Sequence, residues 1–342
     1  MSRVPSHLPK SSRRSFLRHG VACAAISFDA VTTTRSQVIA DTNASTWIDG
    51  KTLIDPHVHV VDPRHPGVPK LFASDDVPLN GALQPLARLL GEQMTASGTS
   101  TALGMPGWSQ ISDRDPLAVQ QTLQIGALLP KGLSLHAIGA ADPNRSTERD
   151  HMKRVEDQLA NGKVKALKCY LGYLPFGPEH EARLPYYELA KKYEIPIIFH
   201  TGDTYSRKAR LKFAHPLRVD DIAVKYPTVR FVLAHLGNPW ILDAAEVIYK
   251  NNQFGDGNVW ADVSALFVST QAEHYERTGI LDDIRKKVRH AIAFTERPDR
   301  FIYASDWPLN GMAFYRDFIK ETVPPEHHKA IFHDNAKLLF DL

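Results

Sequence analysis

The sequence of 342 residues predicts an α/β fold, a single (β/α)8 barrel of the TIM type. Eight apolar runs rich in β-forming residues recur after residue 50, with starts roughly 30 to 47 residues apart. Amphipathic stretches of helical length lie between them, and four of the runs end in a histidine or an aspartate. Because strand–helix alternation produces a parallel sheet, eight repeats favour closure into a barrel. An open, doubly wound sheet stays the alternative, since periodicity does not show closure.

The predicted elements alternate in the order that this barrel requires. Strands are expected at residues 52–60, 99–106, 133–143, 164–172, 196–202, 229–237, 259–266 and 300–308. Helices are expected at residues 185–193, 217–226, 239–250, 280–294 and 325–340. Pro185 suits a first helical turn, where its missing N–H leaves no hydrogen bond unmade. No low-complexity linker or change of composition divides residues 50–342, so we expect one domain there.

Composition and charge narrow the classes of partner. Hydrophobic residues make up 43% of the chain and charged residues 23%, as in ordinary globular proteins. The formal charge of +3 comes from residues 1–40, which carry six basic residues and one acid, and the rest has a net charge of −2. A nucleic-acid surface is therefore not indicated. No apolar run reaches the roughly 18 residues of a membrane span. We expect a small-molecule substrate, and a homodimer is the default assembly for such barrels.

Residues 1–40 form a distinct leader. Arg13 and Arg14, followed by Ser15, Phe16 and Leu17, resemble a twin-arginine export motif, and a modest apolar stretch follows at 20–28. This pattern predicts export to the periplasm with cleavage near residue 40. The alternative is a disordered, weakly basic tail on a cytoplasmic protein. The two cysteines do not distinguish the periplasm from the cytoplasm. One of them lies in the leader, so a processed chain keeps a single thiol and cannot form an internal disulfide.

Polar side chains stand where several predicted strands end. His57 and His59 are two positions apart on the first predicted strand, so their side chains point to the same side and both can face the barrel axis. His200 ends the fifth run, His235 the sixth and Asp306 the eighth. In this fold the carboxyl ends of the strands converge on one site. Any one of these histidines is most simply a hydrogen-bonded core residue, but the set is hard to explain as packing and predicts a metal site.

These segments resemble a known family. The matching segments are Ile54-Asp55-Pro56-His57-Val58-His59, Phe199-His200-Thr201-Gly202, Ala234-His235-Leu236-Gly237, Ala304-Ser305-Asp306-Trp307-Pro308 and Asn335-Ala336-Lys337-Leu338-Leu339-Phe340. In this order they resemble the amidohydrolase superfamily of metal-dependent barrels. Within it they are most similar to the amidohydrolase-related group that includes decarboxylases of the aminocarboxymuconate-semialdehyde type. The resemblance covers residues 50–342 and not the leader.

The resemblance implies a ligand set and roles. His57, His59, His200 and Asp306 would hold the metal, and His235 would lie beside the metal-bound water and polarise it or the substrate. Asp306 could also accept a proton as general base. Three imidazoles and a carboxylate suit Zn²⁺ better than Mg²⁺ or Ca²⁺, with Fe²⁺ and Mn²⁺ left open. Bound zinc lowers the pKa of water to about 7, which makes hydroxide available near neutral pH.

Lys168 ends the fourth run in the register of His200 and His235. In binuclear members of the superfamily a lysine on this strand is carboxylated and bridges two metals. Alternatively, Lys168 stays an ammonium group and binds a substrate carboxylate, or it pairs with a carboxylate at the rim. The first case implies two metal ions and the other two imply one.

Weaker candidates lie in the loops. Arg207, Lys208 and His215 follow the fifth strand and could contact an anionic substrate, although charged loops are usually solvated surface. Trp240 could form a pocket wall or pack under a helix. The loops at 62–79, 173–184 and 203–216 are expected to set specificity, and the first two are long enough to lie over the barrel mouth.

The function predicted first is a metal-dependent hydrolase that cleaves a C–N, C–O or lactone bond of a small molecule, with or without a carboxylate. The alternative is a non-oxidative decarboxylase, a lyase, that uses the same ligands. A third hypothesis is a non-catalytic periplasmic binding protein on a decayed barrel. Decay normally removes ligands first, and here every expected ligand position is filled.

Overall fold

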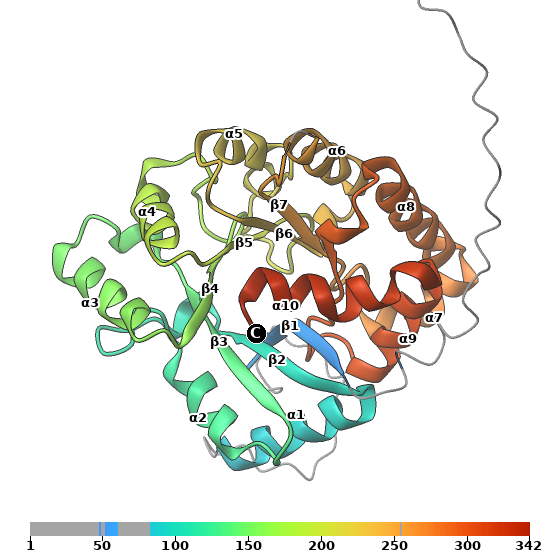
Figure 1. Cartoon of the computed structure of the whole chain (residues 1–342), viewed down its shortest axis with the longest axis horizontal. Helices are drawn as coiled ribbons and strands as arrows, with labels where there is room; N and C mark the ends of the chain where they lie inside the picture. Colours follow the sequence, from blue (N-terminus) through green and yellow to red (C-terminus); the bar gives the residue numbers. More distant parts are fainter. Residues whose placement is uncertain (1–47, 49–51, 61–82, 254) are drawn as a thin grey trace, which may run out of the picture. The chain divides into compact units, whose positions relative to one another are not determined.

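Eight parallel strands form one sheet whose spatial order follows the chain from β1 to β8 (Figure 1). This computed structural model describes residues 48, 52–60, 83–253 and 255–342. The strands are β1 Leu53–His59, β2 Thr99–Met105, β3 Ser134–Ala140, β4 Val164–Cys169, β5 Ile197–His200, β6 Phe231–Ala234, β7 Val259–Asp262 and β8 Phe301–Ile302. All eight predicted strands are confirmed. The last strand is shorter than predicted, because the chain after Ile302 bonds elsewhere, with the Tyr303 N–H donating to the Ile331 carbonyl at 2.8 Å.

Helices follow the strands and cover the outside of the sheet (Figure 1). They are α1 Leu83–Ser97, α2 Gln120–Leu128, α3 Arg149–Ala160, α4 Leu184–Lys192, α5 Arg218–Lys225, α6 Ile241–Asn252, α7 Ala272–Arg277, α8 Ile280–Thr295, α9 Met312–Thr322 and α10 Asn335–Phe340. The five predicted helices are confirmed. The last of them is divided into short pieces, with a π-helical turn at Ala330–Asp334 before α10.

The two edges of the sheet meet, which decides between the barrel and the open sheet. A parallel bridge joins Val58 to Trp307, just beyond β8. The His59 N–H donates to the Trp307 carbonyl at 2.6 Å, and the Asp306 N–H donates to the His57 carbonyl at 2.9 Å. The open, doubly wound alternative is therefore excluded, and closure brings His57 and His59 next to Asp306.

The barrel interior is filled from its amino-terminal end by α10, which lies across the centre of the barrel in Figure 1. Inward-facing residues from successive strands form one apolar cluster with Ala336, Leu339 and Phe340 of α10. The end of the helix is held by two basic side chains. Lys165 donates to the Asp341 carbonyl at 2.6 Å, and Arg230 donates to the Leu339 carbonyl at 2.9 Å. With this end closed, the opposite end of the barrel is left for a site.

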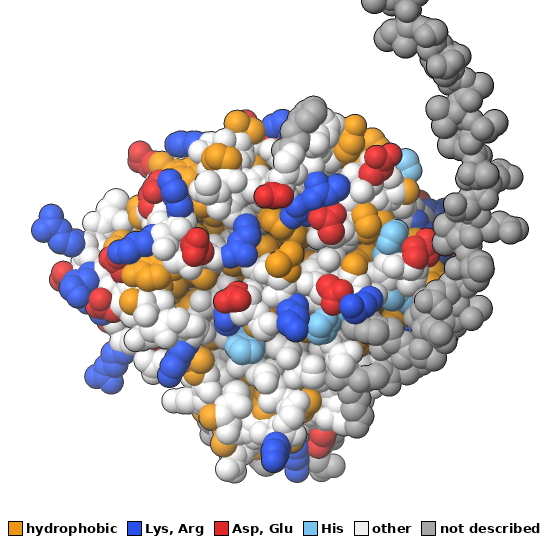
Figure 2. Space-filling model, in the orientation of Figure 1, with side chains coloured by type: hydrophobic (Ala, Val, Ile, Leu, Met, Phe, Trp, Pro, Cys, Tyr) orange, Lys and Arg blue, Asp and Glu red, His pale blue; other side chains and the backbone are white. Residues whose placement is uncertain are grey.

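The described residues belong to one compact unit. On the face drawn in Figure 2, basic and acidic side chains are interspersed rather than segregated. Within the described part of the chain, no helix has both the length and the apolar character needed to cross a bilayer. The predicted export leader at 1–40 and the predicted loop at 62–79 lie outside the described residues. Export, and the position of that loop over the barrel mouth, therefore stay predictions.

Candidate metal centre and cavity

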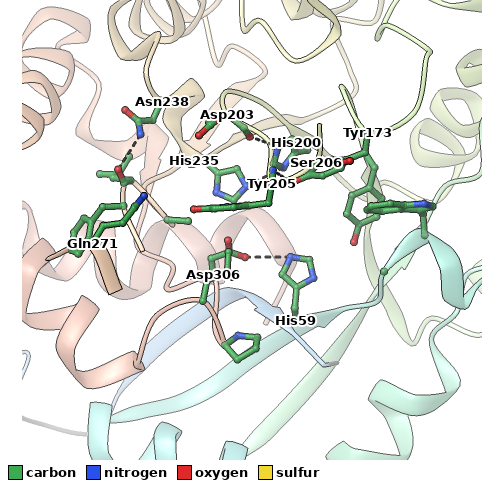
Figure 3. A pocket seen from close by; sticks show the side chains of 18 of the residues that line it. His59, Tyr173, His200, Asp203, Tyr205, Ser206, His235, Asn238, Gln271 and Asp306 are labelled. Atoms are coloured by element: carbon green, nitrogen blue, oxygen red, sulfur yellow. Dashed lines mark hydrogen bonds and ion pairs between the residues drawn. The ribbon is translucent and has the colours of Figure 1, made fainter. Parts of the chain in front are cut away.

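The polar side chains at the strand ends converge at the carboxyl end of the barrel (Figure 3). His57 Nε2 and His59 Nε2 lie 3.3 and 3.2 Å from Asp306 Oδ1. His235 Nε2 lies 3.1 Å from His200 Nδ1. All five residues that the sequence singled out at strand ends are thus brought together, while the roles predicted for them stay predictions.

A subset of these residues forms a group that could hold a divalent metal ion. His57, His235 and Asp306 are buried, and each offers one donor atom within 4.8 Å of the other two. The sequence interpretation placed His235 beside the metal-bound water rather than on the metal. The geometry makes His235 a competent donor as well, with His59 and His200 alongside.

Hydrogen bonds on the outer side of His57 determine which ring nitrogen faces the centre. His57 Nδ1 lies 2.9 Å from Asp262 Oδ2. Burial alone would raise the pKa of Asp262, but His57 and its hydrogen bond outweigh this and hold the pKa below the usual value. An ionised carboxylate only accepts hydrogen bonds. His57 therefore carries its proton on Nδ1 and presents the lone pair of Nε2 to the centre.

The same reasoning applies to the other two buried histidines. His200 Nε2 donates to the Asp203 carbonyl at 2.8 Å, which leaves Nδ1 as a lone pair. Ser264 donates its proton to Asp262 at 2.5 Å, so its oxygen accepts from His235 Nδ1 at 2.8 Å. That leaves His235 Nε2 unprotonated, facing His200 Nδ1. Two imidazole lone pairs at this distance repel unless a cation lies between or beside them, which is the arrangement that a metal ion requires.

Asp306 likewise has a buried acceptor atom without a hydrogen-bond donor among the described residues. Its Oδ1 is buried and accepts no well-directed hydrogen bond, although two imidazole nitrogens lie within 3.3 Å. Burial would raise the pKa of Asp306, but the nearby His57 and His59 outweigh it and hold the pKa below its usual value. An ionised oxygen left without hydrogen bonds is costly in a buried site. A divalent cation at the centre would remove this cost, so the donor set fits a metal.

Burial also keeps the histidines neutral. It lowers the pKa of His235 to about 3, and it lowers the pKa of His200 well below its usual value. Neutral imidazole is the form that binds a metal.

Two strand-end turns aim side chains at this centre with unusual backbone geometry. His235 and Asp306 have φ of 62° and 58°, which is uncommon for residues with a Cβ and costs about 1–3 kcal/mol each. Gly202, with φ of 90°, follows His200 where a Cβ would collide with the Asn238 carbonyl oxygen. That carbonyl accepts from the Asp203 N–H at 2.9 Å, which joins the turns after β5 and β6 and keeps His200 beside His235.

Lys168 lies directly beneath the centre. It is fully buried, and its Nζ lies 3.3 Å from His57 Nε2. Burial lowers the pKa of Lys168 to about 8. Its position at the end of β4 is the predicted one, although it is buried rather than placed at a rim. Carboxylation and substrate binding stay the predicted alternatives.

A cavity of about 290 Å³ opens above the centre. His59, His200, His235 and Asp306 form its floor (Figure 3). Six aromatic side chains contribute to its walls, namely Trp108, Tyr170, Tyr173, Tyr205, Phe267 and Tyr275. The predicted loops at 173–184 and 203–216 both contribute. The volume suits a molecule with a single ring.

The four weaker candidates lie elsewhere. Arg207 and Lys208 are exposed, and neither lines the cavity. The His215 ring packs on Trp240 at 4.7 Å and lies 3.5 Å from Asp243, also outside the cavity. The described geometry gives these residues no contact with a molecule in the cavity, and their predicted substrate role stays untested.

Several important residues were missed from the sequence. Asp262 and Ser264 orient His57 and His235, and Asp262 ends an apolar strand just as Asp306 does. The sequence signal for Asp262, an aspartate that follows an apolar run, was present in the predicted strand at 259–266. The aromatic walls carried no comparable signal, because Trp108, Tyr173 and Tyr205 lie in loops whose conformation the pattern does not specify.

Comparisons with known proteins agree with this geometry. A family model described as amidohydrolase matches residues 54–342, while a search of curated proteins found no match. Among solved structures, 5-carboxyvanillate decarboxylase from Sphingomonas paucimobilis is 14% identical with a TM-score of 0.56, over 86% of this chain and 100% of that one. A 5-carboxyvanillate decarboxylase from Novosphingobium aromaticivorans, solved with bound manganese, is 15% identical with a TM-score of 0.50, over 75% and 80%. A dihydroorotase from Campylobacter jejuni is 12% identical with a TM-score of 0.52, over 85% and 83%. At these identities the likeness concerns the fold.

Proposed function

The chain belongs to the amidohydrolase family, and we propose that it is a metal-dependent, non-oxidative decarboxylase of a small aromatic acid. This ranks the lyase above the hydrolase that the sequence placed first. The observation that carries the proposal is the cavity, in which a metal-competent floor lies beneath aromatic walls. Two of the structurally similar proteins described above are decarboxylases, which supports the same choice.

The aromatic walls favour a flat substrate. The Trp108 ring lies 5.1 Å from Tyr170 and 5.0 Å from Tyr173, and Tyr173 lies 4.8 Å from the His200 ring. These rings form a continuous surface from the mouth to the floor. An aromatic ring packed against such a surface gains about 0.5–1.5 kcal/mol per ring pair beyond the area it buries.

Polar groups on the opposite side can orient ring substituents. Asn238 uses its amide nitrogen to donate to the Leu266 carbonyl at 3.0 Å, and Gln271 uses its amide oxygen to accept from the Val268 N–H at 3.2 Å. Each therefore keeps one end of its amide for a molecule in the cavity. Both residues line the cavity.

The metal would be held by His57, His235 and Asp306, with His59 and His200 alongside as further donors. When bound, it supplies positive charge that neutralises and orients the substrate carboxylate. The donor set accommodates Zn²⁺, the ion expected from the sequence, and also Mn²⁺, which a structurally similar decarboxylase contains. Elemental analysis of the purified protein distinguishes the two.

Asp306 is the group we assign to proton transfer. Loss of carbon dioxide breaks the bond to the carboxylate and leaves its electron pair on the ring carbon, which then needs one proton. Asp306 is ionised at rest, so it first takes a proton from water or a substrate hydroxyl and then delivers it to that carbon. His59, 3.2 Å from Asp306, lies in position to stabilise the carboxylate between these steps.

The test is a product assay on the full chain loaded with Mn²⁺ or with Zn²⁺. Hydroxybenzoates and carboxylated methoxyphenols are offered alongside dihydroorotate and aromatic lactones. We expect carbon dioxide and the matching arene from at least one aromatic acid, and none from protein stripped of metal or carrying Asp306→Asn. Hydrolysis of an amide or a lactone without release of carbon dioxide would instead restore the hydrolase interpretation.

A further inference from the structure

Tyr205 occupies an unusual place in the cavity. It belongs to the segment after β5, and its side chain is 52% exposed although it lines the cavity. Tyr205 lines the same cavity as His235 and Asp306, and in the view of Figure 3 its hydroxyl points away from Tyr173. A substrate bound on the floor would therefore meet this ring.

The backbone holds Tyr205 in place without help from its side chain. The Tyr205 N–H donates to the Tyr173 hydroxyl at 3.0 Å. The Arg210 N–H donates to the Gly172 carbonyl at 2.8 Å, which joins the same two loops a second time. A substitution that alters only the Tyr205 side chain keeps both of these contacts.

The Tyr205 hydroxyl is available to a ligand. Tyr170 donates its hydroxyl proton to the Pro106 carbonyl, and the Tyr173 hydroxyl accepts from Tyr205. No residue in the described part of the chain makes a hydrogen bond to the Tyr205 hydroxyl. Burial, followed by the negative charge of Asp306, raises the pKa of Tyr205 above its usual value, so the hydroxyl keeps its proton and can donate it in a hydrogen bond.

We propose that Tyr205 determines substrate specificity at this site: its ring limits the size of the bound molecule, and its hydroxyl donates a hydrogen bond to an oxygen substituent on the substrate ring. The inference rests on the proposed function and narrows its substrate class. The substrate is a single-ring aromatic acid that carries an oxygen acceptor besides its carboxylate, and an unsubstituted or alkylated benzoate is bound less well.

The hydroxyl is tested by binding, which needs no turnover. The probes are the three isomers of nitrobenzoate and the three of methylbenzoate, titrated calorimetrically into the Mn²⁺-loaded full chain. Nitro and methyl groups are both compact, but only nitro accepts a hydrogen bond. We expect wild type to bind at least one nitro isomer about fivefold more tightly than its methyl counterpart, as one net hydrogen bond gives. Tyr205→Phe should abolish that preference and leave methylbenzoate affinity unchanged.

The ring is tested by a larger probe. We expect Tyr205→Ala to raise the affinity for 2-naphthoate relative to benzoate several-fold, and Tyr205→Phe to leave that ratio as in wild type. Tyr249→Phe is the matched control, because Tyr249 lies on α6 with its ring against Phe294 and does not line the cavity. It should behave as wild type in both assays.

The inference is overturned if Tyr205→Phe retains the nitro preference, if wild type shows none, or if no probe binds wild type. It is likewise overturned if Tyr205→Ala leaves the naphthoate ratio unchanged. These results are separate from those that decide the chemistry. If binding shows nitro selectivity that depends on Tyr205 but no acid releases carbon dioxide, the decarboxylase proposal is wrong and the specificity role of Tyr205 stands. If carbon dioxide is released but binding is unselective, the decarboxylase proposal stands and the specificity role is wrong.

Discussion

Asp262 and His57, 205 positions apart in the chain, are joined by a buried hydrogen bond, with Asp262 Oδ2 2.9 Å from His57 Nδ1. The other oxygen of Asp262 accepts from the Ser264 hydroxyl at 2.5 Å and from the His235 N–H at 2.9 Å. One carboxylate therefore sets the orientation of two of the three residues in the metal-competent group, His57 and His235. Such groups behind the ligands commonly tune metal affinity.

Asp262→Asn should weaken metal binding while the fold survives. The asparagine oxygen can still accept from Ser264, so its NH₂ group must face His57 Nδ1 and donate to it. The His57 proton then moves to Nε2, which removes the lone pair that points at the metal. We expect about a 10- to 100-fold loss of metal affinity, measured by competition with a chelator. Asp157→Asn, on the exposed face of α3, is the control. Unchanged affinity would contradict the tautomer assignment.

Lys168→Met tests the metal count. The methionine nearly conserves the buried volume, and the lysine Nζ 3.3 Å from His57 Nε2 is removed. We expect elemental mass spectrometry to find one metal per chain in wild type and in the variant. Two ions per chain, falling to one or none on substitution, would instead indicate a carboxylated bridge.

Removing the metal should abolish activity and lower the thermal midpoint. Binding to the native state alone stabilises it by RT ln(1 + [L]/Kd), about 4 kcal/mol when the free metal concentration is a thousand times Kd. Scanning calorimetry of chelated, untreated and reloaded protein measures the change, and reloading should restore the midpoint. A midpoint that does not respond to metal would argue against a bound ion at this buried group.

The plug formed by α10 should be essential for stability. Phe340 is buried among inward-facing barrel residues, and Phe340→Ala should cost about 3–5 kcal/mol of unfolding free energy through lost burial and a cavity. Leu338 lies on the same helix but is 78% exposed, so Leu338→Ala should change stability by no more than about 0.5 kcal/mol. Urea titration of both variants gives the comparison, and equal losses would show that α10 is not seated as described.

The leader makes a prediction of its own. If residues 1–40 direct twin-arginine export, changing both Arg13 and Arg14 to lysine should hold the protein in the cytoplasm. Cell fractionation with an activity or antibody readout measures this. Substitution of Lys10 by arginine, outside the motif, serves as the control. Wild type found in the cytoplasm would favour the disordered-tail interpretation, and periplasmic recovery of the double variant would show that export does not depend on the arginine pair.

The sequence was sufficient for the strand order and for five of the converging side chains. Each strand is a local apolar run, and His200, His235 and Asp306 stand directly after such runs. In a parallel barrel all strand ends of one polarity meet at one face, so local placement already implies proximity. The same rule would have found Asp262 at the end of β7.

What the sequence by itself determined is therefore the alternation of eight strands with helices and the set of polar residues at the carboxyl ends of the strands. Only the tertiary structure decided closure through Val58 and Trp307, the burial of Lys168, and the nitrogen that each histidine presents. It also placed Tyr205 in the wall of the cavity. These features depend on pairs of atoms far apart in the chain, such as His57 and Asp262, which are 205 positions apart. A periodic pattern records which way a side chain points along its own strand, whereas hydrogen-bond partners are set by barrel closure and by loop conformation.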